Sequence, residues 1–478
     1  MANTPPLTLD DVRRAHFVGI GGSGMSGLAR LLLDKSIAVS GSDARPGPAA
    51  DALRAHGATV HVGHAAVQVG DADLVVISAA VPADNPEVLE ARRWRIPVLS
   101  HADVLGLLTA RGRGIAIAGT HGKTTTTALV GFLLERAGYD PTILAGAEML
   151  NYGASVRLGR GPHVVVEADE YDRRFLRLVP QVAVVTSVEP DHLDYFRDLA
   201  EIEETFAEFV ARLPADGSLI VCADDAGARG LAGPNRVTYG LEGGASWRAL
   251  DCRPTTFDGR PIKDGRGRAE RRPAYGMEFV AVALDGERAA VLLPLVGRHN
   301  VANALAALAV AHGEGVPLRD AAAAVADFRG TRRRFQPIGS ARGVMVVDDY
   351  AHHPTAVRAT IKAARGVHAG PLWVAFQPHT RNRTRRLLAD FAAALALADG
   401  VVVTAIYEPV GREREPIAVS GADLAAQVSG PPATYVAELE GAAAYLAERL
   451  PPGALLVTMG AGDVDRLGPL VLEVLSDE

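Results

Sequence analysis

The sequence predicts an α/β protein of three consecutive domains, and two observations support this prediction. The chain has 478 residues, whereas a single hydrophobic core rarely serves more than about 250–300 residues. Short apolar runs alternate with helical patterns in three successive series, which is typical of βαβ units that build parallel sheets. We therefore expect domains over residues 1–111, 112–329 and 330–478.

The first series predicts a Rossmann-like N-terminal domain. Residues 15–20, 37–43, 71–78 and 95–100 have the apolar character of buried strands, and residues 23–34 have the period of a helix. The glycine-rich sequence RGRG at 111–114 then interrupts the pattern. A domain boundary near residue 111 follows.

The second and third series predict a central domain of the phosphate-loop type and a Rossmann-like C-terminal domain. In the second series we expect strands at 115–118, 164–169 and 182–188, and helices at 201–213 and 300–313. Its Gly-, Arg- and Pro-rich stretch at 242–275 predicts hairpins and loops at one edge of the sheet. After FRGTRRRF, strand patterns return at 343–350, 371–378, 399–407 and 453–462.

The composition excludes several classes of protein. With 48% hydrophobic and 22% charged residues, the chain is neither disordered nor fibrous. We find no apolar run long enough to cross a membrane and no export signal, so membrane insertion is not expected. The net charge of −7 argues against nucleic-acid binding. Two cysteines cannot form a disulfide framework, which favours a reducing, cytoplasmic setting.

The first motif is GIGGSG at residues 19–24, between a predicted strand and a predicted helix, with Asp43 after the second strand. Glycines in such a turn let the backbone approach a pyrophosphate at the helix N-terminus, and the acid can accept a hydrogen bond from a ribose hydroxyl. NAD, FAD or a sugar nucleotide would fit this pattern. A tight turn without a ligand is the alternative.

The second motif is GTHGKTTTT at residues 119–127, again between a strand and a helix. It supplies the GK(S/T) half of a phosphate-binding loop, in which a lysine reaches the β and γ phosphates and a hydroxyl binds Mg²⁺. The generic pattern would place glycine at Ile117 and therefore fails by one residue. Only four of the 49 basic residues are lysines, so the lysine at 123 indicates a need for a compact point charge.

Carboxylates and a histidine follow two further strands, in EADE at 167–170 and EPDHLD at 189–194. In a parallel sheet both segments emerge at the edge that carries the phosphate loop, where they could hold Mg²⁺ beside a triphosphate.

A fourth group comprises GRHN at 297–300, RRRF at 332–335, DDYAHHP at 348–354 and QPHTRNRT at 377–384. Its arginines could clamp phosphates or a carboxylate, or form only a solvated linker.

Eight motifs in this order resemble the Mur ligases. They are GIGGSGMSGLA, GTHGKTTTT, EADEYDRRFL, EPDHLDYF, GRHNVANALAA, FRGTRRRF, DDYAHHPTAV and FQPHTRNRT. The resemblance implies an N-terminal domain for a UDP sugar, a central ATPase domain and a C-terminal domain for an amino acid. Within the family it implies the branch that joins L-alanine to UDP-N-acetylmuramate for peptidoglycan synthesis, through an acyl phosphate, with ATP and Mg²⁺. It also implies a monomer or weak homodimer.

The resemblance also implies roles for individual residues. The catalytic residues would be Lys123, His192, Arg334, His352 and His353. ATP would contact Gly119, Thr120, His121, Gly122, Lys123, Thr124, Thr125, Asn300, Arg334 and Asp349. The UDP sugar would contact Gly21, Gly22, Ser23, Gly24, Asp43 and His121. The amino acid would contact Tyr350, His379, Arg381 and Arg383, and the metal would be held by Thr124, Glu167 and His192.

The chain departs from the family pattern at three places. Several Mur ligases carry a carbamylated lysine after the DHLD segment, but no lysine occurs here between residues 124 and 262. The chain has TSVE at 186–189 where TNIE is usual, and HTRNRT at 379–384 where HRYTRT or HTxTRT is usual.

The rival hypotheses are the related ligase that recycles a preformed tripeptide, an NAD-dependent oxidoreductase, and a nucleotide-binding module without turnover.

Overall fold

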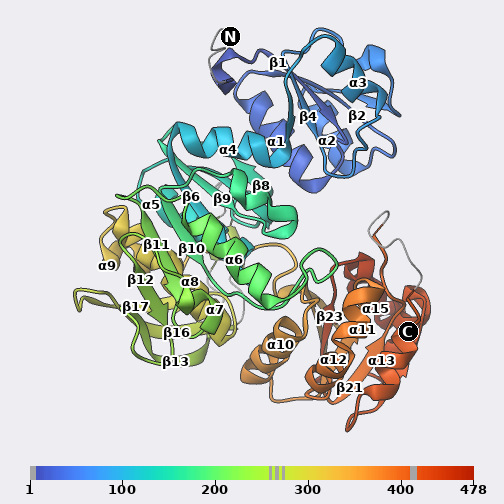
Figure 1. The fold of residues 1–478 in the computed structure, drawn as a ribbon. Helices are drawn as coiled ribbons and strands as arrows, with labels where there is room; N and C mark the ends of the chain where they lie inside the picture. The colour runs from blue at the N-terminus through green and yellow to red at the C-terminus, as the bar shows by residue number, and fades with distance from the viewer. Residues whose placement is uncertain (1–6, 258–260, 264–268, 272–274, 410–416, 478) are drawn as a thin grey trace.

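The structure is a computed structural model that describes residues 7–257, 261–263, 269–271, 275–409 and 417–477. Three large sheets with helices packed against them follow one another along the chain (Figure 1). Most strand pairs are parallel, and the predicted α/β class is confirmed. Among the described residues, no helix combines the length and the hydropathy needed to cross a membrane.

The N-terminal sheet is parallel and has the strand order β3-β2-β1-β4-β5. Its strands are β1 (Arg14–Val18), β2 (Ala38–Asp43), β3 (Thr59–Val62), β4 (Leu74–Ile77) and β5 (Val98–Ser100). Its helices are α1 (Ser23–Asp34), α2 (Pro48–Ala55), α3 (Pro86–Arg93) and α4 (His101–Arg111). The strand order reverses between β1 and β4, so the loop after β1 opens into the crevice where ligands bind in such sheets.

The central sheet has ten strands, in the order β17-β16-β13-β12-β11-β10-β6-β9-β7-β8. The strands are β6 (Arg113–Ala118), β7 (Thr142–Met149), β8 (Ala154–Arg157), β9 (His163–Glu167), β10 (Val182–Val185), β11 (Ser218–Cys222), β12 (Val237–Gly240), β13 (Trp247–Thr256), β16 (Tyr275–Val282) and β17 (Arg288–Leu293). The helices are α5 (Lys123–Arg136), α6 (Leu199–Val210), α7 (Ala226–Gly230), α8 (Arg298–Gly313) and α9 (Leu318–Val325). Because β6 pairs in parallel with both β9 and β10, the carboxyl ends of these three strands meet at one edge.

The segment at 242–275 forms part of the antiparallel edge of this sheet. Strand β13 pairs antiparallel with β16, and β16 pairs antiparallel with β17. A separate pair joins β14 (Pro261–Lys263) to β15 (Ala269–Arg271). Residues 258–260, 264–268 and 272–274 of this segment lie outside the described residues.

The C-terminal sheet has six strands, in the order β18-β19-β23-β20-β21-β22, and all pairs except β18 with β19 are parallel. The strands are β18 (Gln336–Ala341), β19 (Val344–Asp349), β20 (Leu372–Phe376), β21 (Gly400–Val403), β22 (Ala433–Tyr435) and β23 (Leu455–Met459). The helices are α10 (Pro354–Val367), α11 (Arg381–Arg386), α12 (Leu388–Leu395), α13 (Gly421–Gln427), α14 (Leu439–Arg449) and α15 (Leu467–Asp477).

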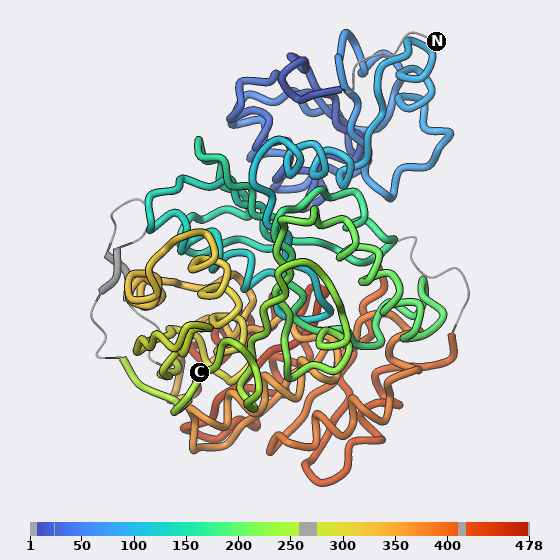
Figure 2. The backbone as a smooth tube through the Cα atoms, turned by 60° about the vertical axis from the view of Figure 1, so that its left-hand side comes forward, coloured from blue at the N-terminus to red at the C-terminus, as the bar shows by residue number. Residues whose placement is uncertain are grey.

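The central domain lies between the other two, as both views of the backbone show (Figures 1 and 2). One hydrophobic cluster runs continuously through the N-terminal and central domains, whereas the C-terminal domain has clusters of its own. Residues 326–335 connect α9 to β18, and we call them the connecting segment. This segment is hydrogen-bonded to the end of β7, because Leu150 N donates to Gly330 O at 3.0 Å and Arg332 N donates to Glu148 O at 2.8 Å. The hydrophobic cores of the C-terminal domain are therefore separate from the core that the first two domains share.

Candidate active site

The phosphate loop connects β6 to α5 and depends on two glycines with positive φ. Gly119 has a φ of 132° and Gly122 has a φ of 80°, in a region that favours glycine. A Cβ on Gly122 would lie 2.4 Å from Oδ1 of Asn303, so close packing also requires glycine there. The loop ends directly at the N-terminus of α5, where backbone N–H groups and the helix dipole favour a phosphate.

Lys123 is the first residue of α5, and its ammonium group is turned back over the loop. Its Nζ lies 2.8 Å from Oε2 and 3.0 Å from Oε1 of Glu170, and it donates to Gly119 O at 2.5 Å. Burial opposes the charge on Lys123, but the carboxylates of Glu170, Glu167 and Asp169 outweigh burial and raise its pKa. The ammonium therefore stays charged at neutral pH.

The segment after β10 braces the phosphate loop from the side. Thr120 N donates to Ser187 O at 2.8 Å, and His121 N donates to Ser187 Oγ at 3.0 Å. Glu189 N donates to Thr120 Oγ1 at 2.9 Å, and Thr186 Oγ1 donates to His121 O. The departure from the family pattern at Ser187 thus still provides a side chain that holds the loop.

Three groups proposed for Mg²⁺ come from the ends of β6, β9 and β10. Thr124 is buried in the first turn of α5. Glu167 ends β9, where its Oε2 accepts a hydrogen bond from Gly146 N at 2.6 Å, and its charge acts on Lys123. His192 follows β10, and the positive charge of Lys123 acts on its ring. The topology thus brings the three groups to one edge of the sheet, around one ammonium group.

His192 has a strained backbone and a neutral ring. Its φ of 51° is unusual for a residue other than glycine, and such strain often occurs at functional sites. Burial and the positive charges of Arg383 and Lys123 lower its pKa to about 4, although Asp191 opposes this shift. A neutral imidazole, a carboxylate and a buried hydroxyl form a donor set that fits a divalent cation beside a phosphate.

The C-terminal domain meets this edge through an ion pair. Arg383 Nη2 donates to Asp191 Oδ1 at 2.5 Å, and both side chains are about nine-tenths buried. Burial opposes the ionisation of Asp191, but Arg383, His192 and His352 hold its pKa well below the usual range. A small hollow lies at this pair, lined by residues 190–194 of the central domain and by Asn382, Arg383, Arg386 and Leu387.

The DDYAHHP segment places two buried histidines near the same interface between the central and C-terminal domains, which we call the seam. Nδ1 of His352 lies 2.8 Å from Tyr350 O, and burial together with the charge of Arg383 lowers the pKa of His352 well below its usual value. Nε2 of His353 lies 3.3 Å from Pro190 O of the central domain. Burial and the charge of His121 also lower the pKa of His353. Both rings are therefore neutral at physiological pH.

The residues that the resemblance assigns to binding the amino acid lie at different distances from the seam. Nδ1 of His379 lies 3.1 Å from Arg383 Nη1, and its ring lies 5.6 Å from that of His352. The Tyr350 ring contacts His352 and the guanidinium of Arg334. Arg381 instead donates to Glu408 Oε1 and Val419 O, each at 2.7 Å. The structure therefore favours Arg383 over Arg381 as the arginine nearest the seam.

Three residues of the ATP set come from two domains: Arg334 and Asp349 from the C-terminal domain and Asn300 from the central domain. The positive charge of Arg334 favours the ionised form of Asp349, but burial outweighs this effect and raises the pKa of Asp349. Asp349 accepts hydrogen bonds from Phe335 N at 2.8 Å and Ala351 N at 2.9 Å. Asn300 is buried at the start of α8 and accepts from Nδ2 of Asn303, the residue packed on Gly122. Asn300 thus contacts the residue that packs on the phosphate loop, whereas Asp349 holds the backbone at Phe335 and Ala351.

The glycine-rich loop of the N-terminal domain is closed by Asp43. The Oδ2 of Asp43 accepts a hydrogen bond from Gly21 N at 2.9 Å, and Gly22 precedes helix α1, which begins at Ser23. A Cβ on Gly24 would lie 3.2 Å from Nε2 of His101. Asp43 thus lies beside the glycine-rich loop at the N-terminus of α1 and accepts a hydrogen bond from the backbone of that loop.

Three residues to which the resemblance assigns no role lie in these sites. They are Glu170, Asp191 and His101. Glu170 and Asp191 stand inside two of the quoted motifs, so their position after a strand is a usable signal. His101 begins α4, outside every motif, and no sequence pattern distinguishes it.

Comparison with known proteins gives consistent matches along the chain. Three family models match consecutive segments: "Mur ligase family, catalytic domain" at 14–113, "Mur ligase middle domain" at 117–311 and "Mur ligase, glutamate ligase domain" at 333–462. The chain is 46% identical to the UDP-N-acetylmuramate–L-alanine ligase of Acidothermus cellulolyticus, over 99% of this chain and 98% of that protein.

Two solved structures have the same overall fold. The UDP-N-acetylmuramate–alanine ligase of Thermotoga maritima matches with a TM-score of 0.76 and 28% identity, over 97% of this chain and 99% of that chain. The murein peptide ligase of Psychrobacter arcticus matches with a TM-score of 0.66 and 25% identity, over 98% of this chain and 99% of that chain.

Proposed function

Because this chain belongs to the Mur ligase family, we propose that its site joins L-alanine to the lactyl carboxylate of UDP-N-acetylmuramate at the expense of ATP. The reaction is ATP-dependent, and its product serves peptidoglycan precursor synthesis. The observation that carries this conclusion is the 46% identity to a UDP-N-acetylmuramate–L-alanine ligase over 99% of the chain. The geometry of the phosphate loop and the domain seam supplies the parts that this chemistry needs.

The chemistry requires activation of a carboxylate, because a carboxylate is a poor acyl donor at neutral pH. One lactyl oxygen attacks the γ phosphorus of ATP, the bond from that phosphorus to the β,γ-bridging oxygen breaks, and ADP leaves. The amine of L-alanine then attacks the carbonyl carbon, and the tetrahedral intermediate expels inorganic phosphate. The amine loses a proton in this step, and the new bond is an amide.

The phosphate loop is assigned to the triphosphate. Gly119 to Thr125 present backbone N–H groups and hydroxyls, and the charged Nζ of Lys123 stabilises the γ-phosphoryl group as negative charge moves through it. Arg334 is a second cation for the phosphates, while Asn300 and Asp349 are assigned to the adenine and the ribose. The raised pKa of Lys123 supports this assignment, because the group must remain an ammonium.

Thr124, Glu167 and His192 would hold Mg²⁺. A magnesium ion bound there would neutralise charge on the β and γ oxygens. The neutral ring of His192 has a lone pair to offer, and Glu167 has one oxygen engaged by Gly146 N. Water or neighbouring carboxylates would complete the shell, since this chain has no lysine between 124 and 262 that could be carbamylated.

The seam between the central and C-terminal domains is assigned to the incoming amino acid. Arg383 and His379 would bind the carboxylate of L-alanine, with Tyr350 beside them and Arg381 in a supporting position. His352 and His353 are buried and neutral, so either can accept a proton or a hydrogen bond near the amine. The same seam would keep water from the acyl phosphate.

The domain roles follow from these assignments. We assign residues 1–111 to the UDP sugar, 112–329 to ATP and 330–478 to the amino acid. Gly21, Gly22, Ser23, Gly24 and Asp43 would contact the UDP group, and His121 would face the muramyl end. The crevice at the strand-order reversal supports the first of these assignments.

A second candidate is the ligation of a preformed tripeptide to the same sugar nucleotide. The similarity to a murein peptide ligase of Psychrobacter arcticus keeps this candidate open to a direct test. The two reactions differ only in the amine acceptor, so the discriminating contacts lie in the C-terminal domain.

A coupled ADP-release assay tests the proposed function. The purified full-length chain is given MgATP and UDP-N-acetylmuramate with L-alanine, glycine, L-serine or L-Ala-γ-D-Glu-diaminopimelate. We expect ADP release that requires both the sugar nucleotide and L-alanine. Faster release with the tripeptide than with L-alanine would favour the second candidate, and release independent of the sugar nucleotide would contradict both.

A further inference from the structure

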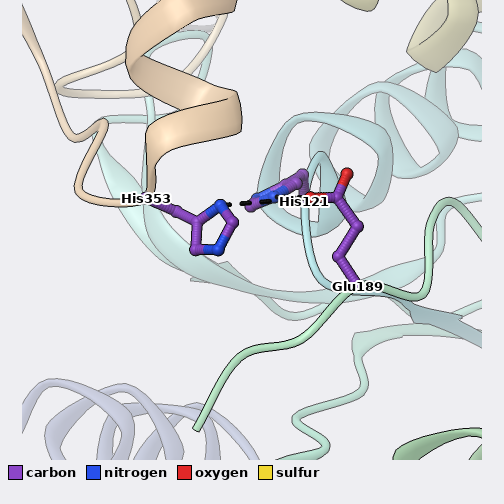
Figure 3. A group of neighbouring side chains, drawn as sticks. All are labelled: His121, Glu189 and His353. Atoms are coloured by element: carbon purple, nitrogen blue, oxygen red, sulfur yellow. Dashed lines mark ion pairs between the residues drawn. The ribbon is translucent and has the colours of Figure 1, made fainter. Parts of the chain in front are cut away.

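Three metal-ligand side chains from two domains converge at the seam: His121, Glu189 and His353 (Figure 3). We call this group the interdomain triad. One ligand atom from each lies within 4.8 Å of the others. His121 is part of the phosphate loop, Glu189 lies after β10, and His353 caps helix α10 of the C-terminal domain. Among the described residues, no second set of three histidine, cysteine or acidic side chains comes this close.

The distances in the interdomain triad suit a small cation. Nε2 of His121 lies 3.5 Å from Oε2 of Glu189, and Nδ1 of His353 lies 4.0 Å from the same oxygen. The two imidazole centroids are 5.0 Å apart. Two ligand atoms bonded to one tetrahedral zinc ion are separated by about 3.3 Å, given zinc–ligand bonds near 2.0–2.1 Å. The ligand atoms lie within 4.8 Å of one another, so closing them to this separation takes relative shifts of up to about 1.5 Å.

The surroundings of His353 determine which of its ring nitrogens faces Glu189. Its Nε2 lies 3.3 Å from Pro190 O, so this nitrogen carries the proton and Nδ1 keeps its lone pair toward Glu189. A ligating histidine commonly donates its other N–H to a backbone carbonyl in this way. Nδ1 of His353 also accepts the helix-capping hydrogen bond from Thr355 N at 3.4 Å, a long bond that a bound cation would replace, while Thr355 Oγ1 donates to Glu189 Oε2 at 2.7 Å and orients the carboxylate.

The donor chemistry selects the class of ion. Two imidazole nitrogens and one carboxylate oxygen suit divalent first-row transition metals such as Zn²⁺, whereas Mg²⁺ prefers a shell made mostly of oxygen ligands. Three protein ligands also leave a fourth position for water or a ligand. The set shares no residue with Thr124, Glu167 and His192, which are assigned to Mg²⁺.

We propose that His121, Glu189 and His353 form a site for a divalent transition-metal ion, represented by Zn²⁺, that ties the C-terminal domain to the central domain. Two ligands come from the central domain and one from the C-terminal domain, so a bound ion forms a direct link across the seam. The proposal goes beyond the ligase function, and because His121 and His353 are also assigned to that function, a bound Zn²⁺ ion would occupy part of the ligase site.

Calorimetric titration with Zn²⁺ tests the site directly. The full-length protein is freed of metals with a chelator and titrated in buffer that contains excess Mg²⁺. We expect one Zn²⁺ per chain, with affinity reduced at least about 10-fold in Glu189→Gln and in His353→Ala. A His56→Ala variant is the matched control, because His56 is an exposed histidine of the N-terminal domain. It should bind like the unmodified chain.

A second measurement uses Co²⁺ and the unmodified protein alone, so it does not rely on any variant. Adding Co²⁺ to the unmodified protein should produce visible absorption bands of mixed nitrogen and oxygen coordination at one equivalent. Zn²⁺ should also raise the thermal unfolding midpoint of the unmodified chain, but not that of His353→Ala, which keeps only the two ligands of one domain. The absence of stoichiometric binding in the unmodified protein, or equal affinity in all variants, would overturn the proposal, whatever the outcome of the ligase assay.

Discussion

The ammonium of Lys123 lies 2.8 Å from Oε2 of Glu170, and both side chains are largely buried. This contact joins the first turn of α5 to the segment after β9, so the phosphate loop and the acidic segment are held in one arrangement. Together with Glu167 and Asp169, Glu170 keeps Lys123 charged despite burial. A preorganised charge needs little reorganisation when a phosphoryl group is transferred beside it.

Replacing Lys123 with alanine should therefore remove most of the catalytic rate. Loss of one preorganised charge typically costs about 3–4 kcal/mol in the transition state, so we expect kcat to fall by roughly 10²–10³-fold or more. Steady-state ADP release measures this effect. Circular dichroism and thermal unfolding establish that the variant is folded, and turnover near that of the unmodified chain would refute the assignment of Lys123.

Gly122→Ala should also abolish activity, and the chain offers a matched control. Gly122 and Gly138 have nearly equal positive φ values of 80° and 85°, but a Cβ on Gly122 would lie 2.4 Å from Asn303 Oδ1, while nothing lies within 4 Å of one on Gly138. Both variants bear the cost of a left-handed backbone, about 1 kcal/mol. Only Gly122→Ala must displace the loop, so ATP binding measured by calorimetry should weaken strongly in that variant alone. Equal binding by the two variants would contradict the proposed loop geometry.

Arg383 and Asp191 should be energetically coupled across the domain seam. A double-mutant cycle with Arg383→Ala and Asp191→Ala, measured by urea unfolding, should give a coupling energy of about 1–3 kcal/mol, because the pair is buried. Arg383→Ala should also raise KM for L-alanine much more than KM for ATP. The exposed pair of Arg381 and Glu408 is the control cycle, for which we expect no more than about 1 kcal/mol. Equal coupling in both cycles would show that the seam contact is not special.

The stability of the metal-free protein should fall as the pH is lowered from about 6.5 toward 4. His192 has a folded-state pKa of about 4, below the ordinary value of 6.5, so the unfolded chain binds its proton first. This single group changes the free energy of unfolding by at most about 1.4 kcal/mol per pH unit within that window. In His192→Asn, denaturant unfolding should show a smaller loss of stability over the same range. An unchanged slope would indicate that His192 is not buried as a neutral ring.

Much of the fold could be predicted because its signals are local. The helix at 23–34 and the strands that precede both glycine-rich loops combine long apolar runs with clear breaks. The carboxyl-edge placement of Glu167 and His192 also followed from the rule that parallel strands end at the same edge. Strands β7, β11, β12, β16 and β17 were not predicted. They are short, contain small residues or lie in antiparallel edge pairs, so their local pattern is weak.

The contacts of the site could be predicted less well than its position. The ion pair of Lys123 with Glu170, 47 positions apart, was not predicted, because it depends on how the segment after β9 turns toward the phosphate loop. The pair of Arg383 with Asp191, 192 positions apart, depends on how the C-terminal domain packs against the central domain. The three members of the interdomain triad stand in three separate motifs. Their proximity depends on the same domain packing, so it could not be predicted from the sequence.

The most direct test of the proposed reaction follows oxygen atoms from the lactyl carboxylate of UDP-N-acetylmuramate. If both carboxylate oxygens are labelled with ¹⁸O, formation of the acyl phosphate and its capture by L-alanine must transfer one labelled oxygen to inorganic phosphate. The other must remain in the new amide. Mass spectrometry of the phosphate should therefore show one ¹⁸O atom for each amide formed. Unlabelled phosphate, with both labelled oxygens accounted for elsewhere, would contradict the mechanism.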